Sequence, residues 1–441
     1  MPMRLGARLT LCALALTFPA LASAQSDNEV NAGIQFNFST PGARSLGMGG
    51  AFLASVDDAT AAYSNPAGLL QLSKPEVLIE GRSWRYETPF ADSGRAAGNP
   101  TGLGGDTVNG VRLGMAESEI EGISYAAFVL PRPTWALALY HHRAADFESS
   151  FSTGGIFGFN GSNNTRLFPV RSTYDLEISS TGLAFARKWN NGVAVGLGVA
   201  AVSLQLDSFT QRYDQADFYD PATYNPARRV NFQTQRGDDQ QAGFNVGLLW
   251  DQGGRLSTGL VYRFGPKFDT ELVSGAPSPE VPFPQRRETV LAGVFNLPDV
   301  FGGGVTFRPT DALSLSLDFN RVYYSELIEE FAVIFPTVEG GSVTIEDFVL
   351  EDVTEIHAGA EYLVIGWRFP LALRAGAWYD PDHRLRSEGR SALHRALFFE
   401  GEDQIHGTAG LGMSIGNVQI DAAADISDQT RTVSLSTAIR F

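Results

Sequence analysis

The stretch Leu313–Asn320 reads LSLSLDFN and alternates strictly between apolar and polar side chains. Successive side chains of a β-strand point to opposite faces, so this stretch predicts a strand with one apolar face and one polar face. The apolar positions are Leu313, Leu315, Leu317 and Phe319, and the polar positions are Ser314, Ser316, Asp318 and Asn320. Such a strand belongs to an antiparallel sheet with different surroundings on its two sides.

The same period of two recurs along the chain from residue 75 onward. It runs through 183–189, 244–250, 256–264 and 432–441. Two architectures fit this pattern. A soluble sandwich or barrel would turn the apolar faces inward, whereas an outer-membrane barrel would turn them outward, toward lipid.

The lengths of the connections favour the membrane barrel. Short links at residues such as 131–134, 189–192, 308–312 and 416–417 alternate with longer ones. The strands that we expect are 75–86, 119–130, 134–146, 172–188, 193–209, 239–250, 255–272, 286–308, 313–326, 353–363, 368–379, 404–415, 418–427 and 430–441. An even count, with short turns at one end and long loops at the other, is typical of bacterial outer-membrane barrels. The predicted fold is therefore an all-β transmembrane antiparallel barrel of about fourteen strands.

Aromatic residues support this orientation. Trp135, Trp189, Trp250 and Trp367 each lie beside a short turn, at one predicted rim. Indole rings favour the boundary between lipid and water, so these residues predict an aromatic girdle. The C-terminal Phe441 resembles the closing aromatic residue that the barrel-assembly machinery recognises.

Composition narrows the class of protein further. The 441 residues are 44% apolar and 19% charged, with a net charge of −16 and a single cysteine. These totals exclude collagen-like, disordered and coiled-coil chains. The acidic balance argues against nucleic acid as a partner, because binding phosphates requires a basic surface.

The first residues read as an export signal. Arg4 and Arg8 precede the apolar run Leu9–Phe18, and Ala22-Ser23-Ala24 has the small-x-small pattern of a cleavage site. The apolar run is shorter than the roughly 18 residues that a spanning helix requires. We expect residues 1–24 to be a cleaved signal peptide and the mature chain to reside in a Gram-negative outer membrane.

Residues 25–74 lack the period of the later chain and are rich in Gly, Ala and Ser. We expect them to form an N-terminal hatch that plugs the lumen of a barrel formed by 75–441. Gly47, Gly49 and Gly50 superficially match a phosphate-binding loop, but no βαβ pattern surrounds them. Close packing or unusual backbone angles explain these glycines more simply.

The hatch region also carries a family resemblance. The run 31–72, with PGARSLGMGGAF, DDATAAY and Asn65-Pro66-Ala67-Gly68, resembles the hatch of the FadL family of outer-membrane transporters of fatty acids and hydrocarbons. The segment 296–320 is similar to a strand–turn–strand of that family. The resemblance implies passive uptake of hydrophobic small molecules, a hatch-gated barrel and a kinked third strand that opens the wall sideways. It assigns Asn65, Pro66, Ala67 and Gly68 to the hatch and its gating.

The hatch sequence PGARSLGMGG is also similar to that of exported barrels related to PorV, which are secretion components. The alternative function is therefore a secretion, attachment or interaction barrel without a hydrocarbon conduit.

Two long loops contain candidate ligand-binding residues. The apolar content of the loop 146–171 predicts a surface groove for a hydrophobic ligand, and the next loop supplies cations for a carboxylate. The candidates are Phe151, Phe157, Phe159, Phe168, Arg228 and Arg229. In the alternative interpretation, the rings pack against one another or against neighbouring loops and order a long connection.

The sequence offers little for catalysis or for cofactors. The six histidines are scattered, HExxH and GxSxG are missing, and we expect no metal, no cofactor and no enzymatic activity. The inward carboxylates Asp318, Asp421 and Asp425 are expected to line the lumen or to pair with Arg263 and Arg374. The expected partners are a hydrophobic ligand, outer-membrane lipid and, through Phe441, the assembly machinery, and we expect a monomer.

Overall fold

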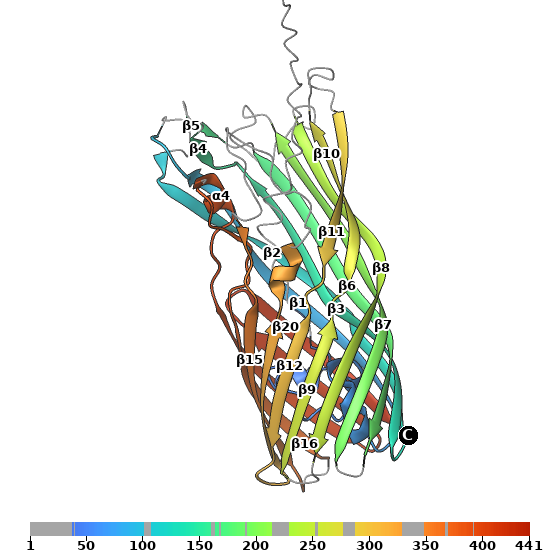
Figure 1. The fold of residues 1–441 in the computed structure, drawn as a ribbon. Helices are drawn as coiled ribbons and strands as arrows, with labels where there is room; N and C mark the ends of the chain where they lie inside the picture. Colours follow the sequence, from blue (N-terminus) through green and yellow to red (C-terminus); the bar gives the residue numbers. More distant parts are fainter. Residues whose placement is uncertain are drawn as a thin grey trace, which may run out of the picture.

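The chain forms a closed β-barrel around a short helical segment (Figure 1). The computed structural model describes residues 38, 40–100, 107–159, 164–166, 169–189, 192–213, 229–251, 255–276, 287–328, 348–366, 369–390 and 392–441. The expected signal peptide and Trp367 lie outside these residues. Within the described part of the chain, no helix is long and apolar enough to cross a bilayer.

Fourteen antiparallel strands form the wall within the described residues, and two of them are each divided into two pieces. They are β1 (Glu76–Arg95), β2 (Gly110–Pro131), β3 (Trp135–Thr153), β6 (Val170–Lys188), β7 (Val193–Tyr213), β8 (Arg229–Asp251), β9 (Leu256–Phe264) with β10 (Lys267–Ala276), β11 (Arg287–Asn296) with β12 (Val300–Phe307), β13 (Leu313–Val322), β15 (Val353–Val364), β16 (Leu371–Asp380), β18 (Gln404–Ile415), β19 (Val418–Ile426) and β20 (Thr430–Arg440). Pairing of β1 with β20 closes the barrel, and the predicted fold class is confirmed.

The apolar faces of the strands point outward. Leu317 on β13 is 38% exposed, whereas its neighbour Asp318 is fully buried. The same alternation holds on β20, where Leu435 is exposed and Ser434 is buried. Of the two architectures with period-two strands, the structure therefore has the one suited to lipid.

The short-turn rim carries the expected tryptophans. Trp135, Trp189 and Trp250 are between 38% and 48% exposed. One short turn differs from the expected asymmetry, because residues 427–429 join β19 to β20 at the long-loop end.

Several strands are longer at the long-loop end than predicted. β2 begins at Gly110 instead of 119, and β8 begins at Arg229 instead of 239. Outward residues such as Glu117 and Asp238 are polar in these extensions, so they interrupt the apolar alternation while the hydrogen-bonded ladder continues. In β2 the outward residues Met115 and Leu113 are apolar again. β13, by contrast, is shorter than the predicted strand 313–326. It ends at Val322, and the short helix η6 (Tyr324–Ile328) follows it.

The wall is interrupted at two places. The ladder between β2 and β3 ends at the pair Tyr125–His142, and the register of β3 against β6 shifts between Arg143 and Ala145. The second interruption separates β9 from β10 at Gly265-Pro266 and β11 from β12 at 297–299. Beside it, no strand pairing joins residues 237–243 of β8 to the described residues of the next strand.

Within the described residues, three short elements precede β1, and they lie inside the barrel toward the short-turn end (Figure 1). They are α2 (Ala43–Gly47), α3 (Ala61–Ser64) and the 3-10 helix η1 (Pro66–Gln71). α2 packs on β18 and β19, whereas η1 packs on β6, β7 and β8. We call residues 40–74 the hatch, because this segment reaches across the lumen from one wall to the other.

The remaining elements lie at the long-loop end. They are the hairpin of β4 (Phe157–Phe159) and β5 (Asn164–Arg166), the small sheet of β14 (Phe348–Val349) and β17 (Arg386–Ser387), and the helix α4 (Ala392–Leu397).

Candidate functional site

The Asn65-Pro66-Ala67-Gly68 turn fixes one side of the hatch to the wall. The Asn65 side chain caps η1 by accepting a hydrogen bond from Ala67 N (3.2 Å). Its amide nitrogen donates to the carbonyl oxygens of Leu53 in the hatch (2.9 Å) and Leu248 in β8 (3.3 Å). One buried side chain therefore joins two hatch segments and the barrel, which explains the chemical need for an amide here.

Glycines in the facing strands make room for this turn. A Cβ on Gly196 of β7 would overlap the backbone of Pro66 and Ala67, and a Cβ on Gly247 of β8 would overlap the Asn65 amide. Gly68 in turn is covered by Val56. At Gly196 the contact is backbone against backbone, so a side chain there would displace the hatch.

Carboxylates from the wall hold the hatch backbone elsewhere. Asp318 on β13 accepts hydrogen bonds from Phe52 N (2.6 Å) and Leu53 N (2.8 Å). Glu80 on β1 accepts from Gly42 N (2.8 Å), and Glu76 accepts from Ala59 N (2.7 Å). Hydrogen bonds to charged acceptors contribute about 1.5–3 kcal/mol each, so these three groups hold the hatch firmly.

The third fixing point is the tight turn after α2. Gly49 and Gly50 adopt positive φ angles of 64° and 78°. His357 Nδ1 lies 2.7 Å from the Gly49 carbonyl oxygen. These glycines meet a conformational need at a close approach, as the sequence indicated.

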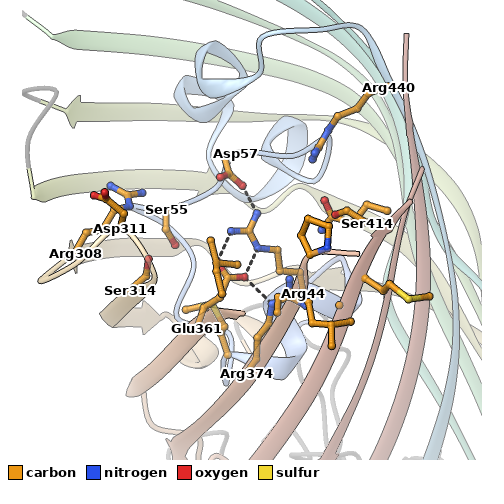
Figure 2. Close-up of a pocket in the computed structure, with 18 residues that line it drawn as sticks. Arg44, Ser55, Asp57, Arg308, Asp311, Ser314, Glu361, Arg374, Ser414 and Arg440 are labelled. Atoms are coloured by element: carbon orange, nitrogen blue, oxygen red, sulfur yellow. Dashed lines mark hydrogen bonds and ion pairs between the residues drawn. The ribbon is translucent and has the colours of Figure 1, made fainter. Parts of the chain in front are cut away.

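A buried ion network lies at the short-turn face of the hatch (Figure 2). Arg44 of α2 pairs with Asp57 in the hatch and makes a two-pronged contact with Glu361 on β15, with both nitrogen–oxygen distances 2.9 Å. Glu361 also accepts from Arg374 Nε (2.7 Å), and Arg374 Nη1 donates to Asp421 (2.6 Å). Burial lowers the pKa of Arg44, but Asp57 and Glu361 more than offset it and hold that pKa well above its usual value.

This network borders a cavity at the short-turn end. The cavity has a volume of about 260 Å³ and opens between the hatch and β15, β16 and β18. Arg308 and Arg440 line it together with the network, so charged side chains border this cavity beside apolar ones such as Met48.

The opposite face of the hatch is bounded by aromatic rings. A cavity of about 80 Å³ lies there, lined by residues that include Phe38, Trp84, Tyr86 and Trp378. The Trp378 ring stacks on His406 with centroids 3.8 Å apart, and its Nε1 donates to Asp425 (2.9 Å). Arg82, Glu355 and His357 also line this cavity, so it combines aromatic faces with charged and polar groups.

A second cavity on this face has a volume of about 40 Å³ and lies beside the interruption between β9 and β10. Tyr63, Tyr140 and Arg263 line it, and Phe38 borders both this cavity and the aromatic one. Tyr63 also contacts His142, with ring centroids 4.3 Å apart, at the point where the ladder between β2 and β3 ends. This single hatch residue therefore touches both interruptions of the wall.

One hatch carboxyl group has an unusual protonation equilibrium. Burial, together with the neighbouring Glu76 carboxylate, raises the pKa of Asp58 to about 7. Its oxygen accepts hydrogen bonds from Thr60 N (2.9 Å) and from the Thr60 hydroxyl. The hatch thus contains a group that titrates near neutral pH.

The candidate groove residues are dispersed. Phe151 stacks on Phe90 of β1 (4.7 Å between centroids), and Phe157 is buried with its carbonyl oxygen accepting from Ala96 N (2.8 Å). Phe151 thus lies in β3 itself, and Phe157 ties the hairpin of β4 and β5 to the end of β1. Arg229 lies over Phe232, 5.0 Å from the ring centroid. Phe168, Arg228 and the side chain of Phe159 lie outside the described part of the chain.

Sequence reasoning missed most of the hatch's partners. Four wall residues hydrogen-bond to its backbone, and they are Glu76, Glu80, Tyr125 and His357. Glu76 and Glu80 follow the hatch directly in β1, whereas His357 is 308 residues from its partner Gly49. The usable signal was polar residues on the inward face of strands, which identified Asp318, Asp421 and Asp425. In the described residues, no group of three metal-binding side chains is close enough to hold an ion.

Comparison with known proteins places this geometry in context. Residues 170–390 match the family model for outer membrane protein transport proteins (OMPP1/FadL/TodX). Among solved structures, a Pseudomonas aeruginosa FadL homologue is similar with a TM-score of 0.63 and 15% identity, covering 92% of this chain and 99% of that one. The P. putida toluene transporter TodX (TM-score 0.60, 14% identity) and the Ralstonia pickettii toluene transporter TbuX (TM-score 0.58, 16% identity) cover the same shares of both chains. These likenesses show the fold, and no curated protein matches the chain.

Proposed function

The chain belongs to the OMPP1/FadL/TodX family of outer-membrane transport proteins, and we propose that it admits hydrophobic small molecules by passive diffusion past its hatch. The ligands in this proposal are long-chain fatty acids or hydrocarbons, and residues 1–24 are the cleaved export signal. The barrel-assembly machinery recognises Phe441, and the protein works as a monomer.

The observation that carries this proposal is the contrast between the two faces of the hatch. On the long-loop face, the aromatic side chains of Phe38, Trp84, Tyr86 and Trp378 line a cavity together with polar groups such as Arg82 and His357. The short-turn face lacks such rings in its described lining and borders the ion network of Arg44 and Glu361. An apolar ligand gains free energy by leaving water for the aromatic side. The ion network at the short-turn face offers no site for an apolar ligand. Such a ligand is therefore expected to leave the barrel lumen before it reaches that face.

The interruption between β2 and β3 supports a sideways route. On the long-loop side of Tyr125 and His142, β2 and β3 are not paired with each other. Ala144 lies in the register shift of β3 against β6. Tyr63 of the hatch packs against His142 at this place. We assign gating to a movement of the Asn65–Gly68 turn that withdraws Tyr63 and lets ligand enter the wall opening.

Uptake measurements test this function. Cells with and without the gene are supplied with labelled alkanes and fatty acids of several chain lengths, at concentrations where the outer membrane limits entry. We expect faster uptake with the gene for at least one class. Equal uptake for every compound and length would reject transport, and it would leave an interaction barrel as the better account.

A further inference from the structure

The interruption beside β8 differs from the one between β2 and β3, because strand pairing resumes beyond it. β8 pairs with β10 over Phe232–Arg236 and with β9 over Phe244–Asp251. No strand pairing joins residues 237–243 of β8 to residues 265–270, all of which the structure describes. We call these two unpaired segments the side window. It is a closed gap in the wall, with paired strands on both its long-loop and its short-turn side.

Side chains replace part of the missing ladder at the side window. Asp239 Oδ2 accepts a hydrogen bond from Asp269 N across the gap (2.9 Å). On the same edge, Gly265 N donates to Asp299 Oδ1 (2.8 Å), and Pro266 has no N–H group that could lack a partner. An open strand edge is unfavourable in a membrane unless its polar groups find other partners. These substitutes for the ladder indicate that the gap is a built feature of the wall.

The outward residues place the side window at one boundary of the apolar belt. Phe244, on its short-turn side, is apolar and 41% exposed, whereas Gln240 and Asp238 within the window are exposed and polar. On the facing edge, Lys267 and Asp269 are likewise exposed and polar. The window therefore lies where the hydrocarbon of the membrane gives way to its polar region on the long-loop side.

The side window meets the lumen at its short-turn end. The cavity of about 40 Å³ on the long-loop face of the hatch is lined by Gly243 and Gly265 of the window and by Tyr63 of the hatch. Phe244 and Phe264 also line this cavity, and their rings stack on each other with centroids 4.9 Å apart. Both side chains are exposed on the outer surface. This ring pair gives the window an apolar edge between lipid and lumen.

A hollow on the outer surface adjoins the long-loop end of the side window. It has a volume of about 630 Å³, and Gly237 and Asp269 of the window line it. Six carboxylates line the hollow, whereas Arg236 is its only arginine. Two of these carboxylates, Asp175 and Asp207, lie directly opposite each other on β6 and β7. The outer approach to the window is therefore strongly negative, which disfavours an anion there.

We propose that the side window is a second lateral port, distinct from the opening between β2 and β3, through which neutral alkyl compounds pass between the membrane and the cavity beside Tyr63. This inference rests on the proposed function and gives it a further route and a ligand class. A neutral chain gains contact with Phe244 and Phe264 and meets no electrostatic barrier. The carboxylates of the hollow disfavour a carboxylate ligand by about three- to fivefold at physiological salt.

The test closes the side window from the lipid side. Ala242 is exposed within the window, so Ala242→Trp places a bulky ring over the gap. Ala201→Trp is the matched control, because Ala201 is exposed on β7 and pairs directly with Ala242 at the same depth. Uptake of labelled hexadecan-1-ol and hexadecanoate is measured in cells that produce wild type, either variant or none of these proteins. Heat modifiability confirms that each barrel is folded.

A second measurement locates the ligand on the full-length protein. Hexadecan-1-ol with a photoactivatable group is cross-linked to purified wild type in lipid vesicles, and mass spectrometry identifies the modified peptides. We expect cross-links on both segments of the side window and fewer of them in Ala242→Trp. A double variant, Asp238→Asn with Asp269→Asn, tests the charge of the approach and should raise hexadecanoate uptake by about twofold.

We expect wild type to accelerate uptake of hexadecan-1-ol, Ala242→Trp to lose a large part of that acceleration, and Ala201→Trp to keep it. Equal hexadecan-1-ol uptake in Ala242→Trp and Ala201→Trp would overturn the port, as would cross-links confined to β2 and β3. Wild type that accelerates neither compound would instead overturn the proposed function, so the two failures are distinguishable.

Discussion

Asp318 gives the most informative perturbation of the hatch. Asp318→Ala removes the acceptor of two hydrogen bonds, from Phe52 N at 2.6 Å and Leu53 N at 2.8 Å, and leaves both amides buried without a partner. Two bonds to a charged acceptor are worth about 3–6 kcal/mol. Asp318 Oδ1 has no partner of its own, so removing the carboxylate also relieves a desolvation cost. We therefore expect the lower end, about 3 kcal/mol, in the free energy of hatch docking.

A loss of about 3 kcal/mol raises the population of the undocked hatch by about 10²-fold. Hydrogen-exchange mass spectrometry of the folded protein should show peptides around Phe52 exchanging about 10²-fold faster in the variant. Asp318→Asn keeps one acceptor oxygen and should show a smaller increase. Asp428→Ala, in an exposed turn, is the control. Unchanged exchange at Phe52 and Leu53 in a folded Asp318→Ala barrel would refute the view that wall carboxylates hold the hatch.

Three further outcomes follow from the same contacts. Gly196→Val should displace the Pro66 turn and raise the ion conductance of the protein in planar bilayers. The control Gly303→Val, on the lipid-facing side, should leave the wild-type conductance unchanged. Equal conductances for the two variants would contradict the close contact between the hatch and β7. Docking of the hatch raises the pKa of Asp58 to about 7, whereas an exposed Asp has a pKa of about 4. Between these pH values the docked hatch therefore binds a proton that the undocked hatch does not. The free energy of docking should weaken as pH rises from about 4 to 7 and then level off. Asp58→Asn should abolish this slope in exchange rates corrected for intrinsic pH dependence, and a slope that persists would assign it to another group. Deleting residues 31–72 should leave a heat-modifiable barrel with altered permeability, and loss of the barrel would show that this segment is part of its core.

The fold was predictable because lipid and lumen impose opposite polarity on alternate residues. In Leu313–Asn320 that alternation identified the strand, its two faces and the inward position of Asp318. The alternation did not predict the long-loop end of β2, where the outward residue Glu117 is polar although the hydrogen-bonded ladder continues. It also missed the division at Gly265-Pro266, since apolar residues continue on both sides of the break.

The site was predictable only in part. Asn65-Pro66-Ala67-Gly68 could be recognised as a motif, and the structure shows why each residue has its size and chemistry. The partners of the hatch could not be predicted, because Asp318 is 266 residues from Phe52 in sequence and meets it only through the register of the barrel. The same dependence on register gives Arg374 its acidic partners Glu361 and Asp421, whereas no ion pair of Arg263 is found among the described residues.

The central claim is that a docked hatch closes the barrel to polar solutes while hydrophobic molecules still pass. The most direct measurement is the entry rate of one hydrophobic and one hydrophilic labelled solute into cells that produce wild type, the 31–72 deletion, or neither protein. We predict that wild type accelerates only the hydrophobic solute and that the deletion accelerates both. Wild type that admits the hydrophilic solute as fast as the deletion does, or that fails to accelerate the hydrophobic one, would contradict the account.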